Sequence, residues 1–283
     1  MHSKDLGEDD LVVTSSTLGN PPFEELVEVA AAAGFRGLSL WPAHDYGQAL
    51  AQGASPDRLA GLLGEAGLAA TTVDCAVVWA GPDDPGAPYF EEPPLSLLLE
   101  TADALGAHLV NVLVVGPRGT GLAEAARAVG DLCDVLAGHG LTAMIEFCAG
   151  TLARNLEVAR SIVATAARPN LGLLVDAWHV HFGAATVAEL AALPGQLIRS
   201  VQLNDAPDER PEDYAHATRH RRLVPGEGAA ELAALLRAVR ATGSSCPLTL
   251  EVFNAEALQR LGVRRWAERL ATSARTIQEL SHA

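Results

Sequence analysis

Eight short apolar runs recur along the chain, and stretches rich in Ala and Leu lie between them. This alternation of strand-like and helix-like segments is typical of an α/β domain with a parallel sheet. A strand and a helix repeating about every 30 residues, eight times over, favour a closed barrel over an open sheet. No GxGxxG motif opens the first unit, which counts against a doubly wound dinucleotide-binding sheet. The predicted strands are 11–16, 37–41, 69–78, 108–115, 141–147, 171–176, 199–204 and 248–253.

We therefore predict one α/β domain, a single (β/α)8 barrel over residues 11–283, preceded by a flexible N-terminal tail over residues 1–10. The segments between the strands support this prediction, because several have helical patterns that close on Gly. Glycine adopts the left-handed conformation that ends many helices. The predicted helices include 23–34, 56–67, 122–140 and 229–243, which close on Gly34, Gly67, Gly140 and Gly243.

Four polar side chains lie inside apolar runs, near the carboxyl ends of four consecutive predicted strands. They are Glu146, Asp176, Gln202 and Glu251. Strand alternation places the apolar neighbours of each one on the opposite face, toward the helices. A carboxylate buried without a compensating charge is costly, and a bound cation is the usual compensation. Since the carboxyl ends of barrel strands form the active-site face, we predict a metal site there.

All four candidate ligands offer oxygen. Three carboxylates and one amide oxygen suit Mg²⁺ or Mn²⁺ better than Zn²⁺, which prefers His and Cys. Any one of these residues taken alone is equally well interpreted as a hydrogen-bonded buried polar group. Four of them on consecutive strands favour the ion.

Charge limits the partners of this protein. The formal net charge is -15, from 20 Lys+Arg against 35 Asp+Glu, and such a field repels nucleic acid. No apolar run reaches the roughly 18 residues of a membrane span, and the first residues lack the apolar core of a secretory signal. The cysteines form no CxxC pair, so we expect reduced, mostly buried thiols in a cytoplasmic protein without a membrane partner. They are Cys75, Cys133, Cys148 and Cys246.

Two connections are longer than the usual few residues, 79–94 after the third predicted strand and 205–228 after the seventh. Both follow a carboxyl end, so both are candidates for a lid or a substrate-binding element. A solvated surface insertion is the alternative interpretation. The second connection is the stronger candidate, because it carries two His and a cluster of Arg.

The order of these residues resembles the xylose isomerase-like TIM barrels, a broad group of sugar phosphate isomerases and epimerases. The matching features are Glu146, Asp-x-x-His at 176–179, a polar residue before the Asn-Asp at 204–205, and Glu251. The resemblance covers nearly the whole chain. It implies one Mn²⁺, Mg²⁺ or Co²⁺ held by the four polar residues, with Glu146 and Glu251 also acting as acid/base groups. Many members carry His where this chain has Gln202.

The resemblance also implies roles for residues around the ligands. In the family a His at the spacing of His179 contacts the metal-bound substrate, so we expect His179 to be catalytic. An Arg near the position of Arg219, Arg221 and Arg222 reaches substrate oxygens, a task that suits the guanidinium fork. Which of the three points inward is left open. Gln202, the LNDAP sequence after it and the later PGEG are in addition similar to 3-dehydroshikimate dehydratases.

Further residues are predicted to contact substrate from the loops and the barrel interior. For Trp41, packing and substrate contact are equally good explanations. For Asn111, a hydrogen bond within the barrel is the first interpretation and substrate contact the second. We interpret His181 as a structural residue. The full set of predicted substrate-binding residues is His44, Trp41, Asn111, Arg219, Arg222 and His216.

The leading functional hypothesis is a metal-dependent isomerase or epimerase of a small sugar or polyhydroxylated keto compound. Proton abstraction next to a carbonyl would give a metal-stabilised enediolate. The alternatives are a dehydratase of the 3-dehydroshikimate type, with His179, His216 or His220 as proton carrier, and a non-catalytic accessory barrel. A DNA-repair nuclease of this fold would need a multi-zinc cluster of many His. Members of the group are often dimers or tetramers, so a homo-oligomer is compatible with the resemblance.

Overall fold

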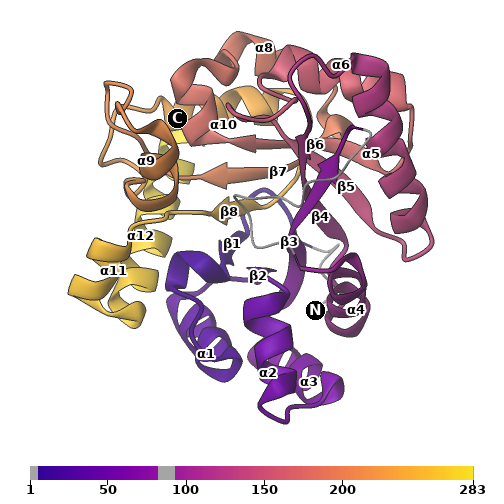
Figure 1. Ribbon diagram of the computed structural model, residues 1–283. Helices are drawn as coiled ribbons and strands as arrows, with labels where there is room; N and C mark the ends of the chain where they lie inside the picture. Colours follow the sequence, from indigo (N-terminus) through magenta and orange to yellow (C-terminus); the bar gives the residue numbers. More distant parts are fainter. Residues whose placement is uncertain (1–5, 82–92, 283) are drawn as a thin grey trace.

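The computed structural model describes residues 6–81 and 93–282, which form a closed barrel of parallel strands surrounded by helices (Figure 1). The strands are hydrogen-bonded in sequence order, and the last one pairs with the first to close the ring. The predicted (β/α)8 barrel is therefore confirmed, and each predicted run coincides with one strand. The strands are β1 (Leu11–Thr14), β2 (Gly37–Leu40), β3 (Ala69–Trp79), β4 (Leu109–Val115), β5 (Thr142–Glu146), β6 (Leu171–Asp176), β7 (Ile198–Leu203) and β8 (Leu248–Leu250).

Helices cover the outside of the ring (Figure 1). Gly34 and Gly67 end two of them in the left-handed conformation, with φ of 81° and 67°, as the sequence predicted. The helices are α1 (Phe23–Ala33), α2 (Gln48–Ala51), α3 (Pro56–Ala66), α4 (Leu95–Leu105), α5 (Leu122–Ala137), α6 (Leu156–Ala166), α7 (Ala177–His179), α8 (Val187–Ala191), α9 (Tyr214–His220), α10 (Leu232–Ala241), α11 (Ala255–Leu261) and α12 (Val263–His282). Short 3-10 turns, η2 (Ser15–Leu18) and η5 (Gly195–Leu197), and π turns, η3 (Ala43–Gly47) and η4 (Val180–Ala184), lie between these elements.

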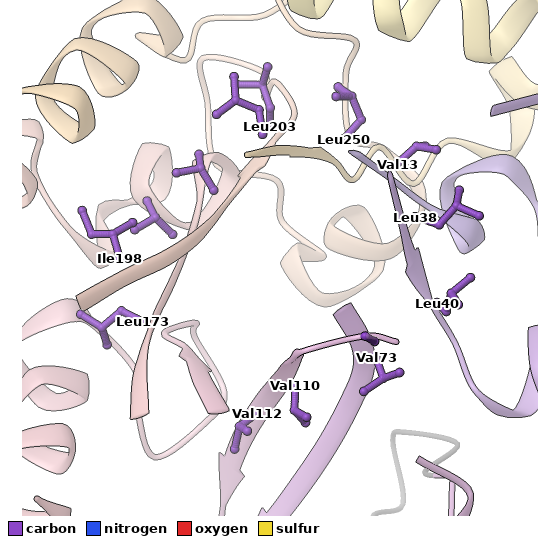
Figure 2. Close-up of a cluster of buried hydrophobic side chains, with 14 of the residues drawn as sticks. Val13, Leu38, Leu40, Val73, Val110, Val112, Leu173, Ile198, Leu203 and Leu250 are labelled. Carbon is purple, nitrogen blue, oxygen red and sulfur yellow. The ribbon is translucent and has the colours of Figure 1, made fainter. Parts of the chain in front are cut away.

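Alternation along the strands divides the apolar side chains between two layers. Ile145, Val175 and Leu203 belong to the main cluster, which packs the strands against the helices. Figure 2 shows part of this cluster, with side chains that come from strands around the whole ring. Met144 and Leu174, which alternate with the main-cluster residues, form a separate small cluster inside the barrel. Polar residues in the same phase as this inner cluster therefore point into the barrel.

The connection between β7 and α10 is built as a structural element. Asp205 and Leu223 form an antiparallel bridge across its base, and α9 lies between them. The arrowheads of β7 and β8 point toward α9 (Figure 1). After α9 the chain returns to the end of β8, where the N–H of Arg222 donates to the Phe253 carbonyl at 3.2 Å. The role of this connection as a lid stays a prediction.

Two sequence predictions lie partly outside the described residues: the tail, of which residues 1–5 are not described, and the 79–94 connection, of which residues 82–92 are not described. The described end of the tail lies against the barrel. Leu6 is buried with Val12 and Ala69, and the Gln278 amide donates to the Glu8 carbonyl at 3.3 Å.

All four cysteines are free thiols, and Cys75, Cys133 and Cys148 are buried, as the sequence predicted. Within residues 6–81 and 93–282, no helix combines the length and the apolar character that crossing a bilayer requires.

Candidate metal and substrate site

Three buried carboxylates meet at the carboxyl ends of the strands. Glu146 and Asp176 are the last residues of β5 and β6, and Glu251 directly follows β8. One oxygen from each lies within 4.8 Å of the others. The sequence predicted a strand as far as residue 253, but β8 ends at Leu250. The strand ends early because the N–H of Val252 donates to the Thr17 hydroxyl, at 3.0 Å, instead of continuing the ladder.

The guanidinium of Arg222 lies among these carboxylates. Its Nη1 donates to Asp176 Oδ2 at 2.8 Å, to Glu251 Oε2 at 2.9 Å and to the Glu251 carbonyl at 3.2 Å. The Arg222 side chain is only 2% exposed. Its Nε donates to the Thr218 carbonyl at 2.8 Å, and its Cζ lies 4.9 Å from the Phe253 ring centroid. Of the three arginines in the cluster, Arg222 is therefore the one that faces the site.

Gln202 completes the set of predicted ligands. It is paired in register with Asp176, and its Nε2 donates to Glu251 Oε1 at 2.8 Å. Its Oε1 is buried and has no hydrogen-bond partner among the described residues. A buried acceptor without a partner is costly, so this oxygen is available to a ligand.

His179 connects the carboxylates to α9. Its Nε2 lies 3.2 Å from Glu146 Oε1, and its Nδ1 lies 2.9 Å from the Tyr214 hydroxyl. The other oxygen of Glu146, Oε2, accepts from the Asn111 amide at 2.9 Å. The predicted hydrogen bond of Asn111 within the barrel is thus present, and its contact with substrate stays a prediction.

Asp176 is fixed by two hydrogen bonds in addition to Arg222. Its Oδ1 accepts from the Trp178 N–H at 2.8 Å and from the Asn204 amide at 2.8 Å. Asn204 is the residue directly after β7, and it is fully buried. The strand-terminal Asn-Asp sequence therefore has a structural task, because its first residue orients a candidate ligand.

The two carboxyls that share Arg222 differ in their pKa. Burial raises the pKa of Glu251 well above its usual range, and the nearby charges of Glu146 and Asp176 raise it further, against the lowering effect of Arg222. Burial by itself would raise the pKa of Asp176 as well. The charges of Arg222 and His179 and the two hydrogen bonds outweigh that effect and lower it. Asp176 is therefore the more acidic member of the pair.

A second pair of buried acids, which the sequence reasoning missed, lies on the β1–β3 side of the barrel mouth. Asp74 on β3 accepts hydrogen bonds from the Ser39 hydroxyl and the Asn111 amide. Asp45 accepts from the Ser15 hydroxyl at 2.6 Å. Asp74 interrupts an apolar strand as Glu146 does, so the same signal was present for it. Asp45 lies in the turn η3 and Tyr214 opens α9, so neither interrupts an apolar strand and neither left such a signal.

Several predicted substrate-binding residues lie outside the carboxylate cluster. His216 and Arg219 are exposed on α9, and their contact with substrate stays a prediction. The Arg219 Nε donates to the carbonyl of Ala215 one turn back, and the His216 ring stacks on His220 with centroids 4.5 Å apart. The turn of α9 that carries them faces away from the barrel because Ala217 is the buried position of that helix.

Trp41 and His44 lie after β2 and are half-buried, with ring centroids 6.4 Å apart. The Trp41 indole nitrogen is buried and has no hydrogen-bond partner among the described residues. Substrate contact by Trp41 and His44 stays a prediction. His181 contacts the Pro207 carbonyl at 3.0 Å, which agrees with its predicted structural role.

The residues present fit a divalent ion. Three carboxylate oxygens lie close together, a buried amide oxygen beside them has no partner, and a positive group already pairs with two of the acids. Cys148 with Glu146 and His179 forms a second grouping of candidate donors within 4.8 Å. Hard oxygen donors favour Mg²⁺ or Mn²⁺, whereas a thiolate and an imidazole favour Zn²⁺. Each grouping has three members, and Gln202 extends the oxygen set to the four ligands that the sequence predicts.

Comparison with known proteins relates this chain to a family. A family model described as xylose isomerase-like TIM barrel matches residues 27–279. A 3-dehydroshikimate dehydratase of Pseudomonas aeruginosa is 39% identical over 105 residues, which are 37% of this chain and 16% of that protein. An inosose isomerase of Bacillus subtilis is 29% identical over 130 residues, 44% of this chain and 45% of that protein. The chain thus matches less than half of the length of either relative.

Solved structures show the same fold over nearly the whole chain. The IOLI protein with a bound zinc atom has a TM-score of 0.81 at 20% identity, covering 95% of this chain and 97% of that one. The probable 3-DHS dehydratase AsbF of Bacillus anthracis has a TM-score of 0.71 at 16% identity, covering 95% and 98%. At these identities the likeness shows the fold alone. Because the family model matches far more than half of the chain, the chain belongs to the xylose isomerase-like TIM barrel family.

Proposed function

We propose that this protein is a divalent-metal-dependent dehydratase of a small polyhydroxylated carbonyl compound. It would remove a proton next to the carbonyl and then expel a hydroxyl group. The observation that carries the proposal is the contact between His179 and Glu146 at the edge of the carboxylate cluster, 3.2 Å from Nε2 to Oε1. Elimination needs a base for the carbon-bound proton and a proton donor for the leaving oxygen, and this pair offers both.

A divalent ion bound by Glu146, Asp176, Gln202 and Glu251 would withdraw electron density from a substrate carbonyl and stabilise the negative charge that develops. The two hydrogen bonds to Asp176 Oδ1 fix the orientation of that carboxylate, and the Asn111 amide fixes Glu146. Such positioning is what a site needs to act without reorganising during the reaction.

The proton steps follow from the contacts of Glu146, His179 and Tyr214. Glu146 accepts the proton from the carbon next to the carbonyl. As the carbon–oxygen bond breaks, Nε2 of His179 donates a proton to the leaving hydroxyl, which departs as water. The Tyr214 hydroxyl, 2.9 Å from Nδ1, holds the ring in the orientation that faces the site. The proton on Glu146 then returns to Nε2 across their 3.2 Å contact, which restores both groups.

The isomerase or epimerase hypothesis is the second candidate, and the position of Glu251 favours it. Glu251 lies within the 4.8 Å grouping with Glu146, so two acid/base groups face one site. Return of the abstracted proton to a neighbouring carbon would isomerise the substrate, and return to its other face would epimerise it. We place the dehydratase first because the dehydratase relative has the higher identity of the two, 39% against 29%.

Replacement of Glu146 by Gln tests the proposal. With Mn²⁺ and 3-dehydroshikimate as the probe, the wild type should generate new ultraviolet absorbance, because dehydration gives a conjugated product. Glu146→Gln should lose about 10²–10⁴-fold in rate, the range that one acid/base group contributes. Glu279→Gln, which changes an exposed residue of α12, is the matched control and should keep the wild-type rate.

Unchanged turnover by Glu146→Gln would exclude its role as base. Conversion of inosose without new absorbance would favour the isomerase or epimerase hypothesis. No turnover of either compound, together with no bound Mn²⁺, would identify a non-catalytic accessory barrel.

A further inference from the structure

The guanidinium of Arg222 pairs with two of the carboxylates that are predicted to hold a divalent cation. Its Nη1 is 2.8 Å from Asp176 Oδ2 and 2.9 Å from Glu251 Oε2, and both carboxylates are predicted ligands of the ion. The same two residues belong to the grouping whose oxygens lie within 4.8 Å of one another. Hydrogen bonds to Arg222 and bonds to an ion would therefore draw on the same two carboxylates.

Burial makes this contact strong. Asp176, Glu251 and Arg222 have side chains that are 0%, 6% and 2% exposed, so water screens their charges very little. A cation arriving between the carboxylates would meet the positive charge of Arg222 at short range. Since like charges repel strongly in a poorly screened site, the ion and the guanidinium oppose each other there.

The backbone of Arg222 and its contacts with the carboxylates are held by separate hydrogen bonds. Its backbone is held at both polar atoms, because its N–H donates to the Phe253 carbonyl at 3.2 Å and its carbonyl accepts from the Asn254 amide at 3.0 Å. Three further hydrogen bonds, to Asp176 and Glu251, come from Nη1 alone. Moving Nη1 away from both carboxylates would leave the two backbone hydrogen bonds in place, and the head-group contact that it would also strain is the 2.8 Å bond from Nε to the Thr218 carbonyl.

We propose that Arg222 is a built-in counter-cation, which competes with the divalent ion for Asp176 and Glu251 and must release both carboxylates when the ion binds. This inference rests on the proposed metal-dependent function and adds a determinant of ion affinity to it. Arg222 compensates the buried acids in the ion-free protein. It weakens ion binding because the ion pairs of Arg222 with Asp176 and Glu251 must break when the ion binds. The buried Gln202 Oε1, which has no partner among the described residues, supplies a ligand that requires no such exchange.

Calorimetric titration of chelator-treated protein with Mn²⁺ tests this competition. Arg222→Gln should bind Mn²⁺ at least about tenfold more tightly than the wild type, because the ion no longer displaces a paired cation. The matched control is Arg221→Gln, which removes the same charge from the neighbouring exposed position and should stay within about twofold of the wild type. Mn²⁺ should also raise the melting temperature of Arg222→Gln more than that of the wild type.

The outcomes separate this inference from the proposed function. Equal or weaker Mn²⁺ binding by Arg222→Gln, beside a wild type that binds, overturns the competition and leaves the metal-dependent function standing. No Mn²⁺ binding by any of the three proteins overturns both.

A measurement on the wild type covers the case in which Arg222→Gln does not fold. Crystals grown with Mn²⁺ should show the ion by its anomalous signal, and Nη1 should lie farther from Asp176 and Glu251 than in crystals grown without Mn²⁺. An ion seated between these carboxylates while both Arg222 contacts persist would contradict the proposal.

Discussion

At the scale of single residues, Asp45 and Asp74 are buried acids whose pKa is shifted by burial and hydrogen bonds, with no cation among the causes. Burial raises the pKa of Asp45 to about 7, although hydrogen bonds from the Ser15 hydroxyl and the Trp41 N–H lower it. Burial likewise raises the pKa of Asp74 to about 6, against the lowering effect of Ser39 and Asn111. Both carboxyls therefore favour the protonated form in mildly acidic solution, whereas Asp176 beside Arg222 does not.

The pKa of Asp45 predicts a pH dependence of stability. Because its folded-state pKa of about 7 exceeds its ordinary value of 3.8, folding favours the neutral carboxyl. This contribution is fully present below 3.8 and is lost as the pH rises to about 7. Asp45→Asn keeps a neutral group of the same shape. Between pH 3.8 and about 7, its unfolding free energy should therefore fall less than that of the wild type, and the difference should be on the order of 4 kcal/mol.

Urea unfolding at a series of pH values measures this difference. Asp57→Asn, at an exposed position of α3, should follow the wild-type curve. Parallel curves for Asp45→Asn and the wild type would show that Asp45 is ionised throughout the window.

At the scale of elements, the connection from β7 to α10 is organised by one side chain. Asp205 Oδ1 accepts from the N–H groups of Ala206 and Ala230, at 2.8 and 3.0 Å, and Oδ2 accepts from those of Gly226 and Gly228, at 2.8 and 3.0 Å. A carboxylate can accept from all four, because each of its oxygens has two lone pairs. Gly228 also has to be Gly, because a Cβ there would meet the Ala206 carbonyl oxygen at 2.2 Å.

Asp205→Asn should therefore destabilise this connection. The amide nitrogen would face two backbone N–H groups and cannot accept a hydrogen bond from either. Leaving buried donors unsatisfied costs about 1–3 kcal/mol each. Denaturant unfolding should show a loss in that range or above it. The control is Asp208→Asn, an exposed residue of the same connection, which should change the unfolding free energy by less than about 0.5 kcal/mol. Equal midpoints for the two variants would mean that Asp205 does not organise the connection.

The elements also show why some of the site could be predicted from sequence and some could not. Glu146 and Asp176 stand out because a carboxylate within an apolar run contradicts its surroundings, and strand alternation fixes the direction in which it points. Arg219 and Arg222 carry no such signal. Their directions depend on where α9 ends and how it packs, and α9 lies in a connection without a repeating pattern. The barrel itself followed from the repeat of eight similar units, which no single position decides.

At the scale of the whole molecule, α12 closes the helical layer over the junction of β1 and β8. Trp266 of α12 is fully buried, and its indole nitrogen donates to the Thr17 carbonyl at 2.9 Å. The Thr17 hydroxyl in turn accepts from the Val252 N–H at 3.0 Å. A side chain from the last helix thus holds the turn after the first strand, and that turn holds the residue after Glu251.

Trp266→Ala should destabilise the whole barrel, because a large buried aromatic side chain and its hydrogen bond are lost together. We expect a decrease of about 3–5 kcal/mol in the unfolding free energy, measured by urea denaturation. Leu280→Ala removes an apolar side chain of the same helix that is 53% exposed, and it should cost far less. A loss below about 1 kcal/mol for Trp266→Ala would show that α12 is dispensable for closing the ring.

The pairing of β8 with β1 completes the candidate metal site, because Glu251 directly follows β8. Glu251 is placed by β8, and Arg222 is anchored at Phe253 beyond it, so a folding intermediate with seven paired strands has neither group in position. Such a chain would present Glu146 and Asp176, which end the paired strands β5 and β6, without Glu251. Under the proposed function, the full set of candidate ligands would come together only in the closed ring.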